Sequence, residues 1–323
     1  MCTAITFQTK NHYFGRNLDL EYSYNETVVV TPRNYPFVFR CAPTVSAHYA
    51  MIGIATIADS YPLYYDATNE YGLSMAALNF PGNAVYYEMA NKRDNIAPFE
   101  LIPWILCQCR TIKEVCKMLD RINIAKIPFS DAYPLSPLHW IIADKHEAIT
   151  VETLVTGMNV IKNPVGVLTN NPPFDYHMHN LTNYMNLTHK EPVNRFSDQI
   201  TLQPYSRGMG AIGLPGDLSS SSRFVRAAFT KLNSRCNDTE EESVAQFLHI
   251  LGSVAQQQGC VVVGESYEIT MYSSCCNTDQ GIYYYTTYNN SQITAVNLQN
   301  EDLEGRNLSS YPLKTKTQIQ WEN

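Results

Sequence analysis

The second residue of the chain is a cysteine, and a strand-like segment follows it directly. Initiator methionine is usually removed before a small residue, and its removal here would leave Cys2 with both a thiol and a free α-amine. An α-amine has a reference pKa of about 7.7–8.0, so near neutrality much of it can accept a proton. Cys2 would then carry a nucleophile together with the base that activates it. Met1-Cys2 alone is equally compatible with a protein that simply has a small second residue.

The residues after Cys2 predict a hairpin. Residues 4–8 alternate polar and apolar side chains, and a polar turn at residues 10–12 leads into a second strand-like segment. The hairpin would return Arg16 and Asp19 towards Cys2, where a carboxylate would hold the terminal ammonium and a guanidinium would favour a thiolate. Residues three apart face opposite sides of a strand, so both can approach only if Gly15 bulges or the strand ends before Asp19. The alternative is an exposed Arg/Asp pair.

A series of short motifs runs in order along essentially the whole chain, at residues 1–3, 13–19, 66–70, 78–83, 98–104, 134–140, 163–172, 206–210, 213–217, 222–226, 272–276 and 281–285. Together these motifs resemble the choloylglycine hydrolase family, which includes bile salt hydrolases and penicillin V acylases. The resemblance is greatest to bile salt hydrolases of gut lactic acid bacteria. The resemblance implies one domain over residues 1–323, with Met1 removed, and the four-layer αββα sandwich of the N-terminal nucleophile hydrolases. Residue patterns alone predict only a mixed α+β fold.

The resemblance also implies roles for polar residues outside the hairpin. Acyl transfer needs donors aimed at the oxyanion of the tetrahedral intermediate. The family pattern makes the Asn170 side chain one donor and the backbone N–H of Asn79 the other, and it puts Arg223 beside the nucleophile. From the residues alone, Asn170 is equally well a turn cap before Asn171-Pro172, and Arg223 a surface cation. The family positions that line the substrate wall, where core packing is the alternative, are Leu18, Ala58, Tyr65, Phe129, Tyr133 and Leu138.

The activity implied is hydrolysis of glycine- and taurine-conjugated bile salts through a thioester on Cys2. Penicillin V acylase is an alternative, although Asn79 occupies a position where that branch typically has tyrosine. A catalytically silent binding or thiol-sensing protein on the same fold is a second alternative. The chain departs from the family at residues 74–77, where Ser-Met-Ala-Ala replaces a glycine-rich stretch next to Asn79.

Composition limits the partners and the compartment. The formal net charge is −7 and there are no runs of Lys or Arg, which argues against nucleic acid and anionic membranes as partners. No apolar run is long enough to span a membrane and no signal peptide is recognisable, so we expect a cytoplasmic protein. The nine cysteines are an odd number, and neither Cys-x-x-Cys nor His-Glu-x-x-His occurs, so we expect no metal and no cofactor. The resemblance implies a homotetramer.

Hydrophobic periodicity predicts the remaining elements. Thr111 with Glu114 forms a capping-box signature that opens a helix. A second helix is expected to be capped by Ser222, with Phe224, Ala228, Phe229 and Leu232 facing inward. A third is expected over residues 241–257. Strands are expected at residues 28–31, 50–58, 73–79, 139–143, 149–154, 165–170, 267–275, 282–288 and 292–298.

Overall fold

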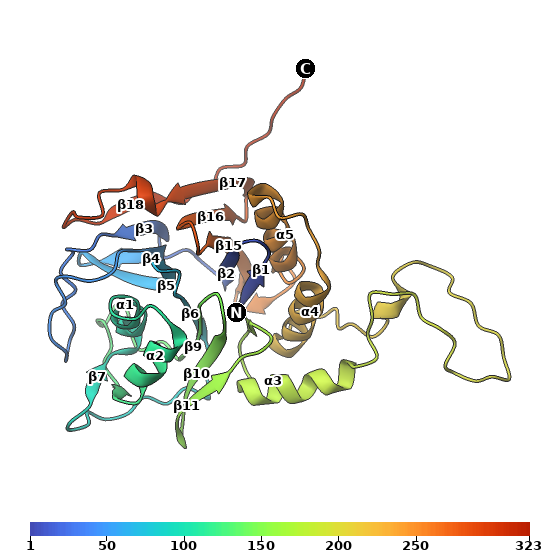
Figure 1. The fold of residues 1–323 in the computed structure, drawn as a ribbon, viewed down its shortest axis with the longest axis horizontal. Coiled ribbons are helices and arrows are strands. Elements are labelled where there is room, and N and C mark those ends of the chain that lie inside the picture. The colour runs from blue at the N-terminus through green and yellow to red at the C-terminus, as the bar shows by residue number, and fades with distance from the viewer.

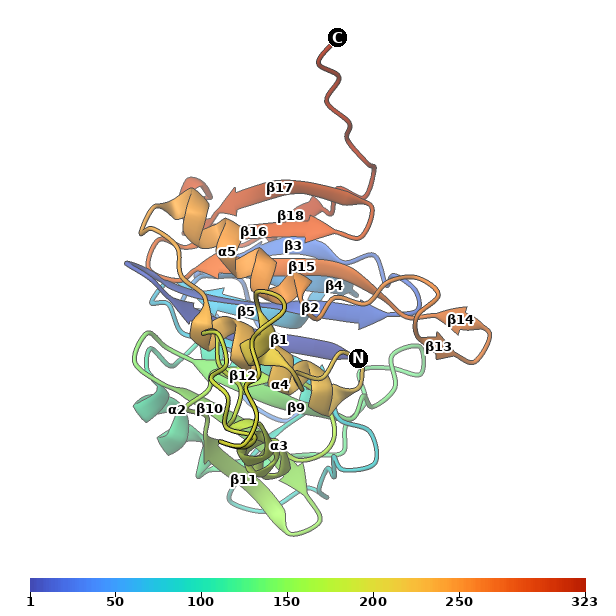
Figure 2. The ribbon, with the colours of Figure 1, turned by 90° about the vertical axis from the view of Figure 1, so that its right-hand side faces the viewer.

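The computed structural model describes residues 1–323, and two antiparallel sheets lie face to face at its centre (Figure 2). The first sheet has the order β12-β1-β2-β15-β16-β17 and the second the order β11-β10-β9-β6-β5-β4-β3-β18. In the first sheet the strands are β12 (Val167–Leu168), β1 (Cys2–Gln8), β2 (His12–Leu20), β15 (Ile269–Asn277), β16 (Ile282–Thr287) and β17 (Asn290–Asn297). In the second they are β11 (Gly157–Lys162), β10 (Ala148–Leu154), β9 (Leu138–Ala143), β6 (Ser74–Asn79), β5 (Tyr61–Asn69), β4 (Met51–Ala58), β3 (Thr27–Thr31) and β18 (Ser309–Pro312).

Helices cover the outer face of each sheet (Figure 1). Helices α4 (Ser220–Asn233) and α5 (Glu240–Gly252) pack on the six-stranded sheet, and α1 (Leu101–Leu106) and α2 (Ile112–Leu119) on the eight-stranded sheet. The expected four-layer αββα sandwich is thus confirmed. The smaller elements are β7 (Asp94–Ile96), β8 (Ile122–Ile124), β13 (Val262–Val263), β14 (Ser266–Tyr267), α3 (Phe174–Leu181), η1 (Pro98–Glu100), η2 (Thr182–Tyr184), η3 (Met209–Ala211) and η4 (Leu298–Asn300).

Two hydrophobic clusters hold the layers together. One cluster of 35 buried residues joins the facing surfaces of the sheets to α4 and α5, and the other, of 30 residues, joins the eight-stranded sheet to α1 and α2. Successive residues of a strand point to opposite faces, and β3 follows this rule. Val28 and Val30 belong to the first cluster and Val29 to the second. The sheets are therefore buried on both faces.

The predicted N-terminal hairpin is confirmed, but without a bulge at Gly15. β1 and β2 pair in one continuous register from Cys2 opposite Leu18 to Gln8 opposite His12. β2 also extends past Asp19, to Leu20. The irregularity lies instead in β15, between Thr270 and Tyr272, opposite the end of β2. An extra residue in the partner strand changes the local twist without interrupting β2 itself.

Four further expectations need correction. The helix expected over residues 241–257 ends at Gly252, after which the chain continues in turns. The strand expected at residues 165–170 is only Val167–Leu168, and that expected at 267–275 is divided at Glu268 between β14 and β15. Helix α4 begins after Ser219, three residues earlier than expected, and Ser222 lies within it. Because any of four consecutive serines can cap a helix, the sequence did not define the start. Leu232, which was expected to face inward, lies in the last turn of α4 and is 56% exposed.

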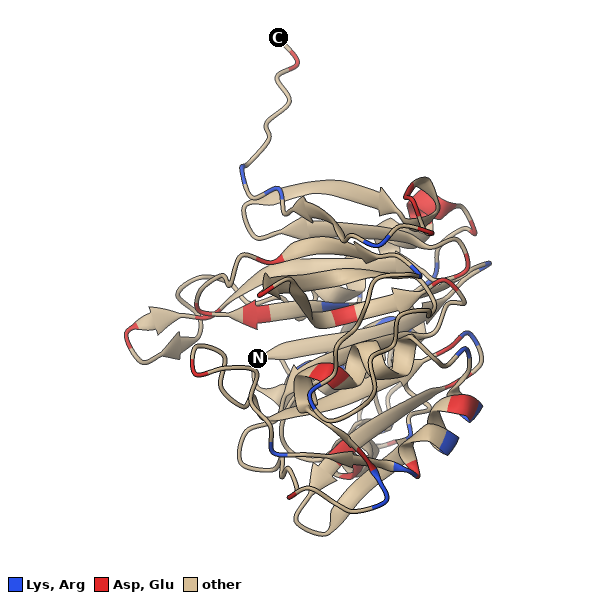
Figure 3. Cartoon of the chain, turned by 90° about the vertical axis from the view of Figure 1, so that its left-hand side faces the viewer, with Lys and Arg blue, Asp and Glu red and all other residues tan.

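The chain between η2 and η3 extends away from the sandwich as an arm, residues 188–210 (Figure 1). Its base is closed by a hydrogen bond from the Thr188 N–H to the Gly210 carbonyl, at 2.9 Å. Basic and acidic residues are interspersed along the chain, and long stretches of the strands carry neither (Figure 3). None of the helices is both long enough and apolar enough to cross a bilayer.

Candidate active site

Cys2 is the first residue of β1 and is 2% exposed. Its backbone N–H donates to Asn170 Oδ1 at 2.8 Å. Met1 precedes it here, so this nitrogen is an amide, and the chain terminus lies one residue further out. The Met1 ammonium donates to the Asp19 carbonyl at 2.9 Å and forms an ion pair with Glu268. The Asp19 N–H in turn donates to the Met1 carbonyl, which continues the β1–β2 ladder to the terminus.

The Asp19 side chain is fully buried beside this terminus. Its Oδ1 accepts a hydrogen bond from Thr270 Oγ1 at 2.6 Å, whereas Oδ2 is buried with no partner. Burial raises the pKa of the Asp19 carboxyl, and the positive charges of Arg223 and of the terminus oppose that rise. Oδ2 is therefore an acceptor that is still available to a nearby ammonium.

Arg16 extends from β2 to the second sheet. Its Nη1 donates to the Tyr65 carbonyl at 3.1 Å and to the Ala77 carbonyl, while Nη2 is buried without a partner. β5 and β6 stop pairing at Asp66 and Ala76, so the guanidinium lies where these strands separate. Burial disfavours its charge, but Cys2 and neighbouring acidic groups raise the pKa of Arg16 above its ordinary value.

Arg223 connects three parts of the site from the first turn of α4. Its Nη1 donates to the Cys2 carbonyl at 2.5 Å and to Thr3 Oγ1 at 2.7 Å. Nη2 donates to Asn170 Oδ1 at 2.7 Å, and Nε to the Leu218 carbonyl at 3.0 Å. Burial lowers the pKa of Arg223, with Asp19 and Cys2 opposing the shift. The arginine is thus buried against the nucleophile and is not a surface cation.

Asn170 and Asn79 lie side by side. Asn170 Nδ2 donates one of its two protons to the Asn79 carbonyl at 2.6 Å, which leaves the other free. The Phe80 N–H donates to the Pro137 carbonyl, so in an antiparallel ladder the Asn79 N–H must face away from β9. On that other side β5 has already stopped pairing with β6. Two N–H donors are therefore free of protein partners close to Cys2.

The expected wall residues fall into two groups. Phe129 and Tyr133 meet edge to face with ring centroids 5.9 Å apart, and with Ala58 and Leu138 they pack on the cluster beneath α1 and α2. Leu138 is paired with Asn79, which links this group to the site. Tyr65 packs on the other cluster, and its hydroxyl is 2.9 Å from Thr56 Oγ1. Leu18 pairs with Cys2 in the ladder between β1 and β2 and is 3% exposed, so it lies beside the nucleophile and packs in the core.

A model of the family described as linear amide C–N hydrolases, choloylglycine hydrolase family, matches residues 2–311. The chain belongs to this family. It is 57% identical over 319 residues to the bile salt hydrolase/transferase of Lactiplantibacillus plantarum, a match that covers 98% of each chain. It is 39% identical over 318 residues to the bile salt hydrolase/transferase of Clostridium perfringens, which covers 96% of each. The protein is accordingly an enzyme that hydrolyses linear amide C–N bonds.

Solved structures of other proteins have the same fold as this enzyme. Crystal structures of two variants of the conjugated bile acid hydrolase from Clostridium perfringens superpose with a TM-score of 0.92, at 36% identity over 100% of both chains. Penicillin V acylase from Agrobacterium tumefaciens superposes with a TM-score of 0.75 at 16% identity, over 98% of this chain and 92% of that one. At that identity the second match supports the fold alone.

Several residues of the site have no recognisable signal in the sequence. Glu268 and Thr270 contact the terminus and Asp19, but as polar residues in a strand-like segment they carry no local signal. The buried pair His139 and Glu152 lies behind Asn170. His139 falls within a motif that matches the family, yet nothing in that motif indicates what the imidazole binds.

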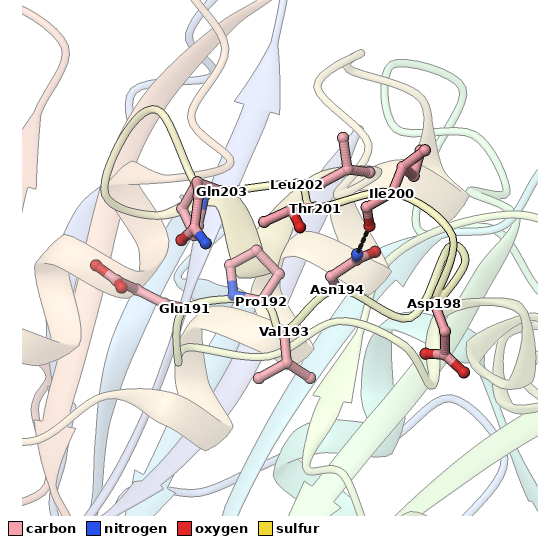
Figure 4. A pocket seen from close by; sticks show the side chains of 10 residues that line it. Glu191, Pro192, Val193, Asn194, Asp198, Ile200, Thr201, Leu202 and Gln203 are labelled. Carbon is pink, nitrogen blue, oxygen red and sulfur yellow. Dashed lines mark hydrogen bonds between the residues drawn. The ribbon is translucent and has the colours of Figure 1, made fainter.

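A hollow of about 580 Å³ lies outside this site, within the arm (Figure 4). It is lined by residues 191–194, 198 and 200–204, and the arm closes on itself through a hydrogen bond from Asn194 Nδ2 to the Ile200 carbonyl at 2.7 Å. None of the expected site residues lines it. No group of three or more His, Cys, Asp or Glu side chains is placed to hold a metal ion.

Proposed function

We propose that this enzyme hydrolyses the amide bond of glycine- and taurine-conjugated bile salts, with Cys2 as the nucleophile once Met1 has been removed. The observation that carries the proposal is the position of Cys2, at the start of a buried strand with Asn170 and Arg223 bonded to its own backbone. Relatives at 57% and 39% identity are named for bile salt hydrolysis, which supports the choice of substrate.

The reaction follows from the groups around Cys2. The thiol sulfur attacks the amide carbon, and the α-amine of Cys2 takes the thiol proton. The free N–H of Asn170 and the backbone N–H of Asn79 stabilise the resulting oxyanion. The α-ammonium protonates the leaving nitrogen, the C–N bond breaks and a thioester remains. Water then attacks the thioester, with the α-amine again as base, and the bile acid leaves as the thiol re-forms.

The carboxylates near the terminus would hold the mature α-ammonium. Asp19 Oδ2 is buried and has no partner, and Glu268 already binds an ammonium at this point of the chain. Each stabilises a positive charge on the terminal nitrogen after it has accepted the thiol proton. Of the two arginines that could face the anionic end of the leaving group, Arg223 is bonded through all three nitrogens, whereas Arg16 retains Nη2. This favours Arg16.

The first prediction tests the substrate. We expect kcat/KM for glycine and taurine conjugates of cholic acid to exceed that for penicillin V by a wide margin. A steroid buries more apolar surface than a phenoxyacetyl group, at about 25 cal/mol per Å² before the costs of binding are subtracted. The side chains of Phe129 and Tyr133 supply apolar surface for contact with the steroid. Equal values for the three compounds, or a preference for penicillin V, would overturn the bile-salt assignment while leaving the cysteine chemistry intact.

Two controls test the nucleophile. The Cys2→Ala variant is expected to fold and to lose hydrolysis. A form that retains any residue ahead of Cys2, verified by intact mass, is also expected to be inactive, because its nitrogen at Cys2 is an amide. Full activity of the uncleaved form would rule out the α-amine as the base.

We also propose that the enzyme is a cytoplasmic homotetramer, with the arm as a subunit contact. All nine cysteines are free thiols, as expected in a reducing compartment. The arm exposes apolar side chains far from the core, including Val193 at 69%, Phe196 at 81% and Tyr205 at 85%. Such a surface favours a protein contact.

The second prediction tests this assembly by light scattering after size exclusion. The double variant Phe196→Ser with Tyr205→Ser is expected to have a smaller assembly mass than the wild type, because it removes apolar contact area. Val155→Ser is the control, since Val155 is 87% exposed on the sandwich and outside the arm. A tetramer that survives the double variant unchanged would exclude the arm as the contact.

A further inference from the structure

His139 is a buried histidine of β9 that contacts the backbone of the site from behind. It is 0% exposed. Its Nε2 lies 2.9 Å from the Thr169 carbonyl, and its Nδ1 lies 3.1 Å from Glu152 Oε1 on the neighbouring strand β10. Glu152 Oε1 also accepts the N–H of Phe174, the first residue of α3, at 2.9 Å. Both sides of the turn that carries Asn170 are thus bonded to this pair.

The hydrogen-bond partners fix one ring proton of His139 and allow a second. A carbonyl oxygen only accepts, so Nε2 of His139 must carry a proton towards Thr169. Glu152 Oε1 already accepts from Phe174, and as a carboxylate oxygen it can accept a second N–H, from Nδ1. An imidazole ring protonated on both nitrogens is a cation, and the buried Glu152 carboxylate beside it would supply the counter-charge. The second oxygen of that carboxylate, Oε2, is buried without a partner.

The same ring also contacts the second donor. Phe80, which follows Asn79, stacks on His139 with ring centroids 4.2 Å apart and planes 6° apart. Such stacking of a cation on an aromatic face is favourable. In the ladder between β6 and β9, His139 pairs with Leu78, and Leu138 pairs with Asn79. One side chain therefore contacts the residue before Asn170 and the residue after Asn79.

We propose that His139 and Glu152 form a buried ion pair that positions the two oxyanion donors, Asn170 and the Asn79 N–H, relative to each other. The inference rests on the proposed function and adds positioning residues to it. His177 supports the same turn, since its Nε2 is 2.9 Å from the Asn170 carbonyl and its ring stacks on Phe224. Burial lowers the pKa of His177, and its bond to the Asn170 carbonyl opposes that shift.

Glu152→Gln tests the pair with little change in shape. The glutamine oxygen can still accept from Phe174, but it has no charge to hold the second proton on His139. We expect kcat for a conjugated bile salt to fall about 10- to 100-fold with KM nearly unchanged, because small misplacement of a donor costs this much in the transition state. The kcat of His139→Gln, which also loses the stack on Phe80, is expected to fall at least as far.

A readout independent of substrate accompanies the kinetics. In protein labelled with ¹⁵N in the histidine rings, the His139 signals are assigned by their absence from His139→Gln. We expect two protonated ring nitrogens at neutral pH in the wild type and one in Glu152→Gln. The control is His12→Gln, which removes another buried histidine that is bonded to Thr278 at the far end of β2. It is expected to lower stability but to leave kcat unchanged.

The outcomes separate the two proposals. Wild-type kcat in Glu152→Gln, or a single ring proton on His139 in the wild type, would overturn the positioning role. A loss of kcat in His12→Gln equal to that in Glu152→Gln would also overturn it, since the effect would then follow stability alone. If the wild type failed to cleave any bile salt, the proposed function would be wrong. The number of protons on the His139 ring would still test the ion pair with Glu152.

Discussion

At the scale of single residues, the carboxamide of Asn170 makes contacts in three directions. Its oxygen accepts from the Cys2 N–H and from Arg223, and its nitrogen donates to the Asn79 carbonyl. These bonds hold the remaining amide proton in one direction before substrate arrives. A donor fixed in this way stabilises developing charge without reorganising, which is the condition for efficient oxyanion stabilisation.

The third prediction follows from this arrangement. Asn170→Ala is expected to lower kcat by roughly 10²–10³-fold with a smaller change in KM, because the lost bond strengthens mainly in the transition state. Asn171→Ala is the matched control, since the side chain of Asn171 donates to the Pro81 carbonyl instead. Steady-state kinetics on one conjugated bile salt decides between them. A large loss of kcat in Asn171→Ala, together with a nearly normal kcat in Asn170→Ala, would contradict the assignment.

At the scale of elements, β2 delivers both Arg16 and Asp19 because it is packed closely against β15. A Cβ built on Gly15 would lie 2.0 Å from the Ser274 carbonyl oxygen. Gly15 therefore allows β2 and β15 to approach closely, and it does not form a bulge. The irregularity in β15, between Thr270 and Tyr272, then lets Thr270 bond Asp19 while the ladder continues towards Phe14.

The fourth prediction concerns this contact. Gly15→Ala is expected to destabilise the protein by about 1–3 kcal/mol or more, because the clash is with backbone and cannot be relieved by a side-chain rotation. Chemical denaturation measures the loss. Gly216→Ala is the control, because nothing lies within 4 Å of a Cβ at that position. Equal stability of the two variants would show that β2 and β15 can separate at no cost.

At the scale of the whole molecule, Arg16 connects the two sheets. It leaves β2 in the first sheet and donates to the carbonyls of Tyr65 and Ala77 in the second. The buried carboxylate of Asp66 is among its charge partners and also accepts from Tyr272 at 2.9 Å. The site thus lies where the sheets are joined by polar contacts, within an otherwise hydrophobic interface.

The fifth prediction tests this connection. Arg16→Met keeps an unbranched apolar stem but removes the guanidinium, which leaves Asp66 without its positive neighbour and two carbonyls without a donor. Breaking one partner of a buried charge group costs roughly 3–5 kcal/mol, so we expect a large fall in the free energy of unfolding together with lost turnover. The exposed Arg93→Met should be close to wild type. If urea unfolding found the two variants alike, Arg16 would have no part in joining the sheets.

The amino-acid sequence by itself determined the local parts of this enzyme. Alternation after Cys2 and the turn at residues 10–12 were sufficient to predict the hairpin, although not its regular register, and the capping signature at Thr111 predicted the start of α2, where Thr111 accepts from the Glu114 N–H. These features depend on residues a few positions apart, so propensity and periodicity describe them. The run of four serines at the start of α4 offers four possible capping residues, so the sequence does not define where that helix begins.

Only the tertiary structure decided which distant groups meet at the terminus. Asn170 and Arg223 lie 168 and 221 residues from Cys2, and Glu268 is 267 residues from Met1. The motifs suggested the first two through family resemblance, whereas Glu268 and the pair of His139 with Glu152 had no signal. Their contacts depend on the order of strands in two sheets and on the packing of α4, which bring together residues that have no local influence on one another.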